Sequence, residues 1–124
     1  MAVQLTRREL DVMAVLWQLG DATVADVRDQ LADQLAYPTV LTVLRTLELK
    51  GHVRHEADEK AFRWFAVTRP NDAGDGALKR LIAKVYNGSR ELLISRVVAD
   101  RNVSAEELRR IRRVLNERLK EIEK

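Results

Sequence analysis

The sequence contains no cysteine among its 124 residues, so disulfides, thiolate metal sites and cysteine nucleophiles are excluded. It also has no apolar run approaching the roughly 18 residues of a membrane-spanning helix. The N-terminal stretch MAVQLTRREL lacks the hydrophobic segment of a signal peptide. We therefore expect a cytoplasmic protein without a membrane segment, built as one domain or two small ones.

Groups that could support catalysis or bind a metal are also scarce. No Ser/His/Asp arrangement, pair of carboxylates or glycine-rich phosphate loop stands out in the sequence. The two histidines, His52 and His55, would lie on opposite faces of a strand, and no third ligand is nearby. We therefore expect no enzyme activity, no metal site and no cofactor.

A basic balance is present, but it is unevenly distributed. The net charge is +3 and the isoelectric point is about 9.5. Residues 1–70 carry 9 Lys/Arg and 10 Asp/Glu, whereas residues 71–124 carry 13 Lys/Arg and 9 Asp/Glu. Between Arg45 and Arg69, six cations face four anions, while aspartates dominate residues 21–33. This distribution is a weak electrostatic signal for nucleic-acid binding.

Residues 37–50, YPTVLTVLRTLELK, predict an amphipathic helix around which the remaining elements are organised. Pro38 suits the first helical position, and Gly51 suits a left-handed residue that ends the helix. Four apolar residues recur at the i, i+3, i+4 and i+7 spacing of a buried helix face. They are Val40, Val43, Leu44 and Leu47.

The opposite face of this helix carries short polar and cationic side chains, namely Thr39, Thr42, Arg45 and Thr46. Threonine methyl groups can contact thymine, hydroxyl groups can bond base edges, and arginine can reach guanine or a phosphate. The face therefore suits a DNA major groove. An ordinary amphipathic helix has the same apolar stripe, so the neighbouring elements decide between the two interpretations.

Two helical patterns precede this helix. Thr6 and Glu9 have the spacing of a capping box before a helix over about residues 7–19, with Trp17 expected in the core. Thr23 begins a second helix with aspartates on its outer face, and a short turn then leads to Pro38. Two helices joined by a short turn form a helix-turn-helix.

After Gly51 the hydrophobic period changes to about two, which indicates strands. Residues 52–56 and 61–68 are the predicted strands, and the polar residues 57–60 are the turn between them. Three helices followed by a hairpin are the order of a winged helix, with this turn as the wing tip. Arg54, Lys60 and Arg63 would then contact phosphates, which position a protein on DNA without specifying its sequence.

The linker-like stretch 69–76 divides a predicted DNA-binding domain, residues 1–70, from a helical dimerisation domain, residues 71–124. Three short helices are expected beyond it, the second opened by Ser89 and the third by a capping box from Ser104 to Glu107. These three short helices are too small to bury their apolar seams alone. We therefore expect a second copy of the chain to cover them. The alternative is that the seams pack back on the N-terminal domain. The seam residues are Leu81, Val85, Leu92, Leu93, Val97, Leu108, Ile111, Leu115 and Leu119.

Taken together, these pieces resemble the penicillinase and methicillin-resistance repressors, the BlaI/MecI family, which has copper-responsive CopY relatives. The resemblance covers nearly the whole chain, in element order, linker position and length. The residues that carry it are Leu5, Thr6, Glu9, Trp17, the run from Tyr37 to Leu44, Leu47, Lys50, Gly51, Phe62, Trp64, Asn87, Gly88 and Ser89.

The resemblance implies a dimeric winged-helix repressor that binds a dyad-symmetric operator, with Thr39 and Thr42 at base-facing positions. Three departures qualify it. Thr46 stands where such repressors often have a second cation. Arg96-Val97 aligns with the Asn-Phe bond that a signal-dependent protease cleaves in the β-lactam-responsive members, and the cysteines of the copper-sensing members are absent.

The sequence thus predicts a mainly α fold with a small β-hairpin: an N-terminal winged helix-turn-helix and a C-terminal helical dimerisation module. The predicted function is a homodimeric repressor whose partners are an operator in double-stranded DNA, itself and a signal-dependent protease. An alternative is a protein-interaction module in which Arg109, Arg110, Arg112 and Arg113 bind an acidic partner; otherwise these arginines pair with Glu106, Glu107 and Glu117. The predicted DNA-binding residues are Thr39, Thr42, Arg45, Thr46, Lys50, Arg54, Lys60 and Arg63.

Overall fold

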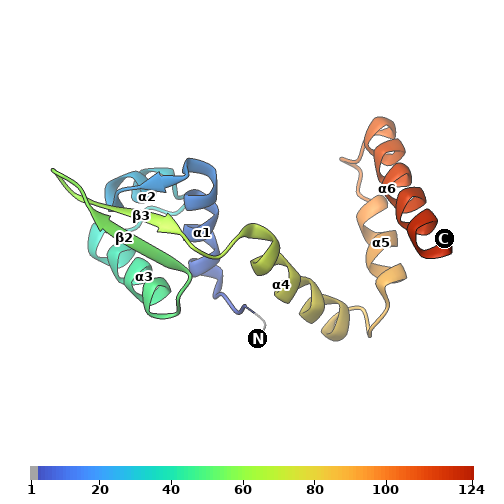
Figure 1. Cartoon of the computed structure of the whole chain (residues 1–124), viewed down its shortest axis with the longest axis horizontal. Helices are drawn as coiled ribbons and strands as arrows, with labels where there is room; N and C mark the ends of the chain where they lie inside the picture. Colours follow the sequence, from blue (N-terminus) through green and yellow to red (C-terminus); the bar gives the residue numbers. More distant parts are fainter. Residues whose placement is uncertain (1–2) are drawn as a thin grey trace. The chain divides into compact units, whose positions relative to one another are not determined.

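The computed structural model describes residues 3–124 and contains two compact units, Met1–Lys79 (unit 1) and Arg80–Lys124 (unit 2). The fold is mainly helical with a small antiparallel sheet, as the sequence predicts (Figure 1). None of the helices within residues 3–124 is long and apolar enough to cross a membrane. The elements are α1 (Arg7–Leu19), β1 (Asp21–Ala22), α2 (Val24–Gln30), α3 (Tyr37–Leu49), β2 (Val53–Ala57), β3 (Phe62–Ala66), α4 (Pro70–Lys84), α5 (Arg90–Val98) and α6 (Ala105–Glu123).

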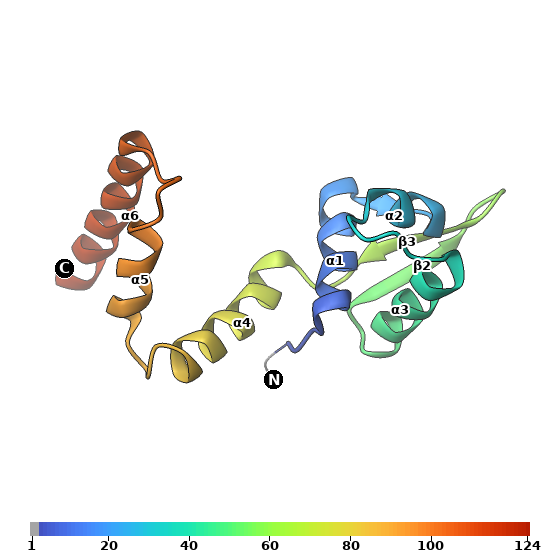
Figure 2. The same cartoon turned by 180° about the vertical axis from the view of Figure 1, so that it is seen from behind.

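The core of unit 1 lies where α1, α2 and α3 gather around the sheet (Figure 2). The predicted inward face of α3 is confirmed, because Val40, Leu44 and Leu47 are fully buried. Trp17 is partly buried against the same core, and its indole Nε1 donates to the carbonyl oxygen of Thr68 at 2.8 Å. The polar face of α3 is therefore fixed toward the outside by its own apolar stripe.

Local signals set the helix ends that position α3. The Thr6 hydroxyl accepts from the Glu9 amide at 3.1 Å, and the Glu9 carboxylate accepts from the Thr6 amide at 2.9 Å, so the predicted capping box forms. Gly51 has a φ of 84°, which confirms the left-handed end of α3. Pro38 was expected at the first helical position, but the helix begins at Tyr37, and Pro38 is second. The second amide of a helix is also unpaired, so proline fits there equally well.

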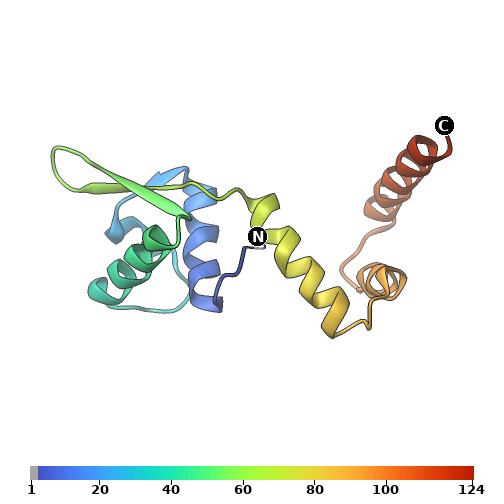
Figure 3. The same ribbon diagram turned by 60° about the horizontal axis from the view of Figure 1, so that its bottom comes forward.

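The sheet has three strands in the order β1-β3-β2, all antiparallel, rather than the two strands that the sequence predicts. The additional strand β1 follows α1 directly and pairs Ala22 with Trp64. The hairpin turn falls at residues 58–61 instead of 57–60, closed by the Asp58 amide donating to the Ala61 carbonyl at 2.9 Å. The β2–β3 hairpin projects beyond α3 as a wing (Figure 3).

The expected linker over residues 69–76 is wrong, because α4 begins at Pro70 and runs through it. Proline suits a helix start, and Asp72 lies in the first turn. Gly76 has a packing reason: a Cβ at this position would lie 2.6 Å from the backbone oxygen of Val3. The glycines of this stretch therefore do not indicate a flexible connection. The compact units divide between Lys79 and Arg80, later than the predicted boundary at residue 70.

The helices of unit 2 begin at the predicted serines. Ser89 accepts from the Leu92 amide at 3.1 Å, and Ser104 accepts from the Glu107 amide at 3.0 Å. The second half of the expected capping box, from Glu107 back to Ser104, does not form. No residue of α5 or α6 is buried, although both helices are fully within the described chain.

Candidate nucleic-acid interface

The outward face of α3 presents the side chains that the sequence predicts. Thr39, Thr42 and Arg45 are exposed, and Thr46 is half-buried. They follow one another along the helix, opposite the buried stripe of Val40, Leu44 and Leu47. The fold therefore brings three hydroxyl groups and one guanidinium group onto a single strip of about two helical turns.

Two of the three hydroxyl groups are bonded to the backbone of α3 itself. Thr42 Oγ1 donates to the carbonyl oxygen of Pro38 at 2.9 Å, and Thr46 Oγ1 donates to that of Thr42 at 3.0 Å. A hydroxyl group has one donor and two acceptor positions, so both oxygens keep acceptor capacity. In this geometry they suit the exocyclic amino groups of adenine or cytosine, and their methyl groups suit thymine.

The wing brings a second cation close to the helix. Arg45 of α3 and Lys60 of the wing tip line the same surface groove, although they are distant in sequence. Neither side chain has a carboxylate within 4 Å in the described part of the chain. Their charges are therefore available to an anion outside the chain.

Two other predicted phosphate contacts are engaged within the sheet. Arg54 pairs with the Glu56 carboxylate and lies over the Phe65 ring, with its guanidinium carbon 4.4 Å from the ring centroid. Arg63 donates to Asp21 Oδ1 at 3.0 Å, and this hydrogen bond raises the pKa of Arg63 above its usual range. Both cations are thus locally compensated, unlike Lys60.

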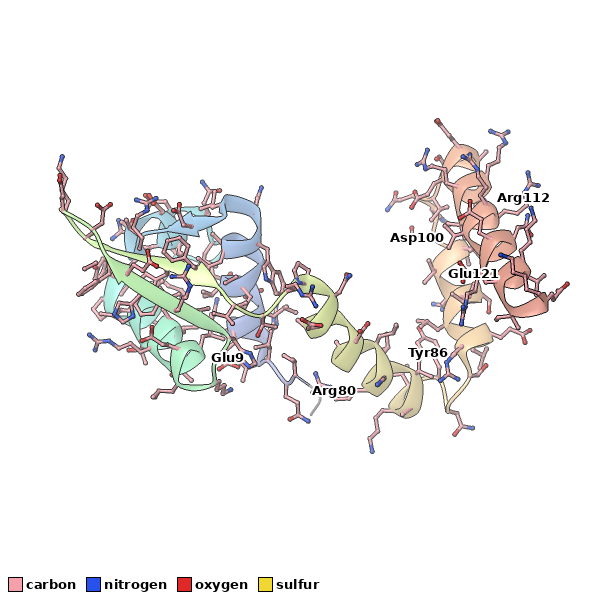
Figure 4. The ribbon with its side chains drawn as sticks, in the orientation of Figure 1. Glu9, Arg80, Tyr86, Asp100, Arg112 and Glu121 are labelled. Atoms are coloured by element: carbon pink, nitrogen blue, oxygen red, sulfur yellow. The ribbon has the colours of Figure 1, made fainter. Side chains whose placement is uncertain are left out.

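Lys50, also predicted to bind DNA, lies in an ion pair that ties the end of α3 to the start of α1. Its Nζ is 2.9 Å and 2.8 Å from the two carboxylate oxygens of Glu9, which is only 4% exposed (Figure 4). Burial raises the pKa of Glu9, but hydrogen bonds from Lys50 and the Thr6 backbone outweigh it and leave the pKa below its ordinary value. The charge of Lys50 is therefore already neutralised.

The histidines do not share a site. His52 Nδ1 lies 2.8 Å from the Thr68 hydroxyl, and His55 Nδ1 pairs with the Glu48 carboxylate. The His55 ring also packs on Trp64, with centroids 4.7 Å apart. Within residues 3–124, no three His, Asp or Glu side chains converge on a point where they could hold a metal ion.

The arginines of α6 form few of the predicted pairs. Arg110 lies 3.5 Å from Glu106, and Arg118 pairs with Glu121 at 3.0 Å. In the described residues, no carboxylate lies within 4 Å of the other three arginines of the cluster, of which Figure 4 labels Arg112. The expected pairing with Glu107 and Glu117 is therefore wrong. The unpaired members are Arg109, Arg112 and Arg113.

The sequence did not indicate the carboxylates that form ion pairs with Lys50 and Arg63. Glu9 and Asp21 lie 41 and 42 positions away from their partners, so no local spacing connects them. One signal was available for Glu9: it already belonged to a capping box at the start of α1. The capping box does not indicate that the end of α3 lies beside Glu9.

Three helices, a small antiparallel sheet and a projecting hairpin beside the third helix define a winged-helix DNA-binding protein. The penicillinase repressor family model matches residues 5–117, and the chain belongs to this family. It is therefore a DNA-binding transcriptional repressor and not an enzyme.

Relatives and solved structures agree with this assignment. The chain is 24% identical to the methicillin resistance regulatory protein MecI of Staphylococcus aureus, over 93% of this chain and 95% of MecI. It is 22% identical to the penicillinase repressor of Bacillus licheniformis, over 92% and 91%. The solution structure of Bacillus licheniformis BlaI with the blaP half-operator is similar in fold, with a TM-score of 0.50 and 24% identity over 58% of this chain and 90% of that one.

Proposed function

We propose that the repressor acts as a homodimer on a dyad-symmetric operator, with unit 1 reading each half-site and the C-terminal helices joining the two copies. The observation that carries the proposal is the uncovered apolar face of α6. Leu108, Leu115 and Leu119 are 38%, 52% and 53% exposed, although their spacing is that of a buried seam. An exposed apolar stripe of this kind is typical of a protein–protein interface.

The remaining seam residues support the same interpretation. Apolar side chains at the predicted positions of α4 and α5 are also exposed, by 39% at Leu81, 53% at Leu92 and 48% at Val97. Two copies related by a two-fold axis would cover these faces with identical faces. The residues we assign to the dimer interface are Leu81, Val85, Leu92, Leu93, Val97, Leu108, Ile111, Leu115 and Leu119.

Each copy would place α3 in a major groove. We assign base contacts to Thr39, Thr42 and Arg45, and a backbone phosphate contact to Lys60. Two-fold symmetry would then set the two helices one DNA turn apart or a multiple of it, roughly 34 Å per turn. The related BlaI structure holds a monomer on a half-operator, which supports one subunit for each half-site.

The test is binding to DNA from the region upstream of the repressor's own gene, measured by mobility shift with excess competitor DNA. We expect a competitor-resistant shift with the wild-type chain and a loss of about 10- to 100-fold in affinity for Thr42→Ala/Arg45→Ala. Arg69→Ala, which removes an exposed cation elsewhere in unit 1, is the matched control. A shift of equal strength in the double variant would contradict the assignment of α3.

The dimeric part of the proposal has a separate readout. An operator with both half-sites should bind the chain far more tightly than the same DNA with one half-site scrambled, because the dimer engages both at once. Equal affinity for the two DNAs would contradict a dyad-symmetric operator. Footprinting would then give the length and centre of the site.

The three unpaired arginines of α6 favour one second candidate, a surface for an acidic protein partner. Arg109→Ala/Arg113→Ala should leave operator binding nearly unchanged if α6 serves dimerisation alone. A loss of operator binding comparable to that of Thr42→Ala would assign these arginines to DNA contacts instead. A signal-dependent protease stays a predicted partner, although Arg96-Val97, which lies in α5, differs from the Asn-Phe bond of the β-lactam-responsive members.

A further inference from the structure

A groove of about 360 Å³ lies between the start of α2, α3 and the wing, on the surface of unit 1. It falls in the range of small-molecule sites, about 300–1,000 Å³, which are lined mainly by apolar and aromatic side chains with a few polar groups. Val24 and Leu41 contribute aliphatic lining from α2 and α3. Nothing in the reading of DNA bases by Thr39 and Thr42 requires this apolar surface.

Aromatic residues concentrate in the groove. The chain has only six Phe, Trp and Tyr residues, and three of them, Tyr37, Phe62 and Trp64, line this one groove. Tyr37 is 46% exposed and Phe62 is 55% exposed, so both residues are accessible to a ligand. Such a surface favours a planar apolar ligand, because aromatic pairs gain energy beyond the area that they bury.

The rim of the groove carries positive charge. Arg45 and Lys60 both line it, and neither has a carboxylate within 4 Å among residues 3–124. Lys50, Arg54 and Arg63, the other predicted DNA-binding cations, all have one. The groove therefore combines an apolar body with an uncompensated cationic edge, which suits an anionic group on a flat ring.

Trp64 adds a buried donor. Its indole Nε1 is the one buried side-chain polar atom without a hydrogen-bond partner in the described part of the chain, and the residue is 2% exposed. Buried polar groups normally have a partner, so an isolated one calls for an explanation. The same residue lines the groove and pairs with Ala22 and His55 in the sheet.

We propose that this groove is a binding site for a small planar aromatic carboxylate, with the ring against Tyr37 and Phe62, next to the buried Trp64, and the carboxylate between Arg45 and Lys60. Duplex DNA also offers anions, but its flat apolar faces are stacked inside the helix, so it does not satisfy the aromatic part of the groove. A guanidinium group and an ammonium group are both suited to a carboxylate.

A ligand in this groove would compete with operator DNA for the same side chains. This inference rests on the proposed function. Arg45 and Lys60 are the cations that we assign to the operator, and one set of side chains cannot hold both anions at once. A ligand bound only to the free protein weakens the apparent DNA affinity by a factor of 1 + [L]/Kd. The ligand would thus act as an inducer that releases the repressor.

Ligand binding is tested first without DNA, by two-dimensional NMR of the ¹⁵N-labelled full chain titrated with 2-naphthoate. The chain has two tryptophans, so it gives two indole N–H signals, and Trp17→Phe assigns them. We expect the Trp64 signal to shift and the Trp17 signal, whose N–H is bonded to the Thr68 carbonyl, to stay. Neutral 2-naphthamide, of nearly the same shape, should bind at least about tenfold more weakly, because it lacks the charge.

Variants locate the site within the groove. Lys60→Ala should weaken 2-naphthoate binding several-fold, and Ala25→Leu should block it by filling the groove; Lys79→Ala, an exposed cation outside it, is the control. The proposal is overturned if no shift occurs up to about 1 mM ligand. It is also overturned if the amide binds as well as the carboxylate, or if both indole signals shift alike.

Operator binding measured in the presence of the ligand distinguishes the ligand-site proposal from the proposed function. At a ligand concentration of 10 Kd, the apparent affinity for a DNA with a single half-site should fall about 11-fold. If the chain binds 2-naphthoate but no operator, the proposed function fails and the site stands. If ligand binds at Trp64 and operator affinity is unchanged, the competition is wrong.

Discussion

Unit 1 and unit 2 are both largely helical, yet they differ in how their apolar residues are used. Helices α1, α2 and α3 enclose a core with Met13, Leu16 and Leu44 at 0% exposure. Helices α5 and α6 contain a comparable set of leucines, and none of their residues is buried. Unit 1 therefore has a closed core and an outward polar face to which we assign DNA binding, whereas the exposed apolar faces of unit 2 are those we assign to dimerisation.

The net charges of the two units are the opposite of what their assigned roles would suggest. Unit 1 carries 10 Lys/Arg and 12 Asp/Glu, a net charge of −2, and unit 2 carries 12 Lys/Arg and 7 Asp/Glu, a net charge of +5. The unit to which we assign DNA reading is thus the acidic one. The proposed interface therefore depends on a few uncompensated cations, Arg45 and Lys60, and not on the total charge of the unit.

The largest expected effect comes from placing a charge in the apolar seam of α6, which we assign to the dimer interface. We expect Leu115→Lys to raise the dimer dissociation constant roughly 100-fold, because burying an unpaired ammonium group costs about 3 kcal/mol. Sedimentation equilibrium measures this change. Glu117→Lys places the same residue on the opposite side of α6 and should keep the wild-type dimer. If Leu115→Lys also dimerises normally, the seam is not the interface.

Truncation of one leucine in each unit sharpens the contrast. Leu44→Ala should lower the free energy of unfolding by about 2–5 kcal/mol, since Leu44 is fully buried in unit 1. Leu119→Ala, at a residue 53% exposed in the single chain, should change it by less than about 0.5 kcal/mol at concentrations where the protein is monomeric. Urea unfolding measures both. Equal costs in dilute solution would show that unit 2 is already covered within one chain.

The Glu9–Lys50 pair belongs to unit 1 alone and gives it an acid sensitivity. Lys50→Met should lower the free energy of unfolding by about 2–3 kcal/mol, because it leaves the buried Glu9 carboxylate without its cation. Glu9→Gln should cost less, since an amide can stay hydrogen-bonded to Thr6 without a charge.

The pH dependence follows from the sign of the shift. The pKa of Glu9 is lower in the fold than in the unfolded chain, so its contribution to stability is complete above the ordinary glutamate pKa. It is lost as the pH falls from that value through the lowered one. Thermal unfolding across this window should show a smaller loss for Glu9→Gln than for the wild type. Parallel curves would remove the pair from the acid response.

Much of unit 1 was predictable because its signals are local. The apolar stripe of α3, the Thr6 capping box and the alternation in the hairpin each depend on residues within about two helical turns of one another. What failed depends on tertiary context. Strand β1 is two residues long and pairs with β3, and α4 continues through a glycine-containing stretch in which Gly76 lies against the Val3 backbone.

The site followed the same division. The outward direction of Thr39, Thr42 and Arg45 could be derived from the stripe behind them. The fates of Lys50 and Arg63 could not, because Glu9 and Asp21 reach them only in the folded chain. The aromatic groove joins α2, α3 and the wing, so no single stretch of sequence indicates it.

The smallest expected effect is a change in the salt dependence of DNA affinity, which indicates which unit supplies the phosphate contacts. Lys60→Ala should reduce the slope of log affinity against log salt by about 0.9 for each subunit, because one phosphate contact no longer releases its counterion. Arg113→Ala removes an equally unpaired cation from the more basic unit 2 and should leave the slope unchanged. Fluorescence anisotropy with an operator duplex over a range of salt measures both slopes. A reduced slope for Arg113→Ala and not for Lys60→Ala would move the phosphate contacts to unit 2, and total charge would then outweigh local placement.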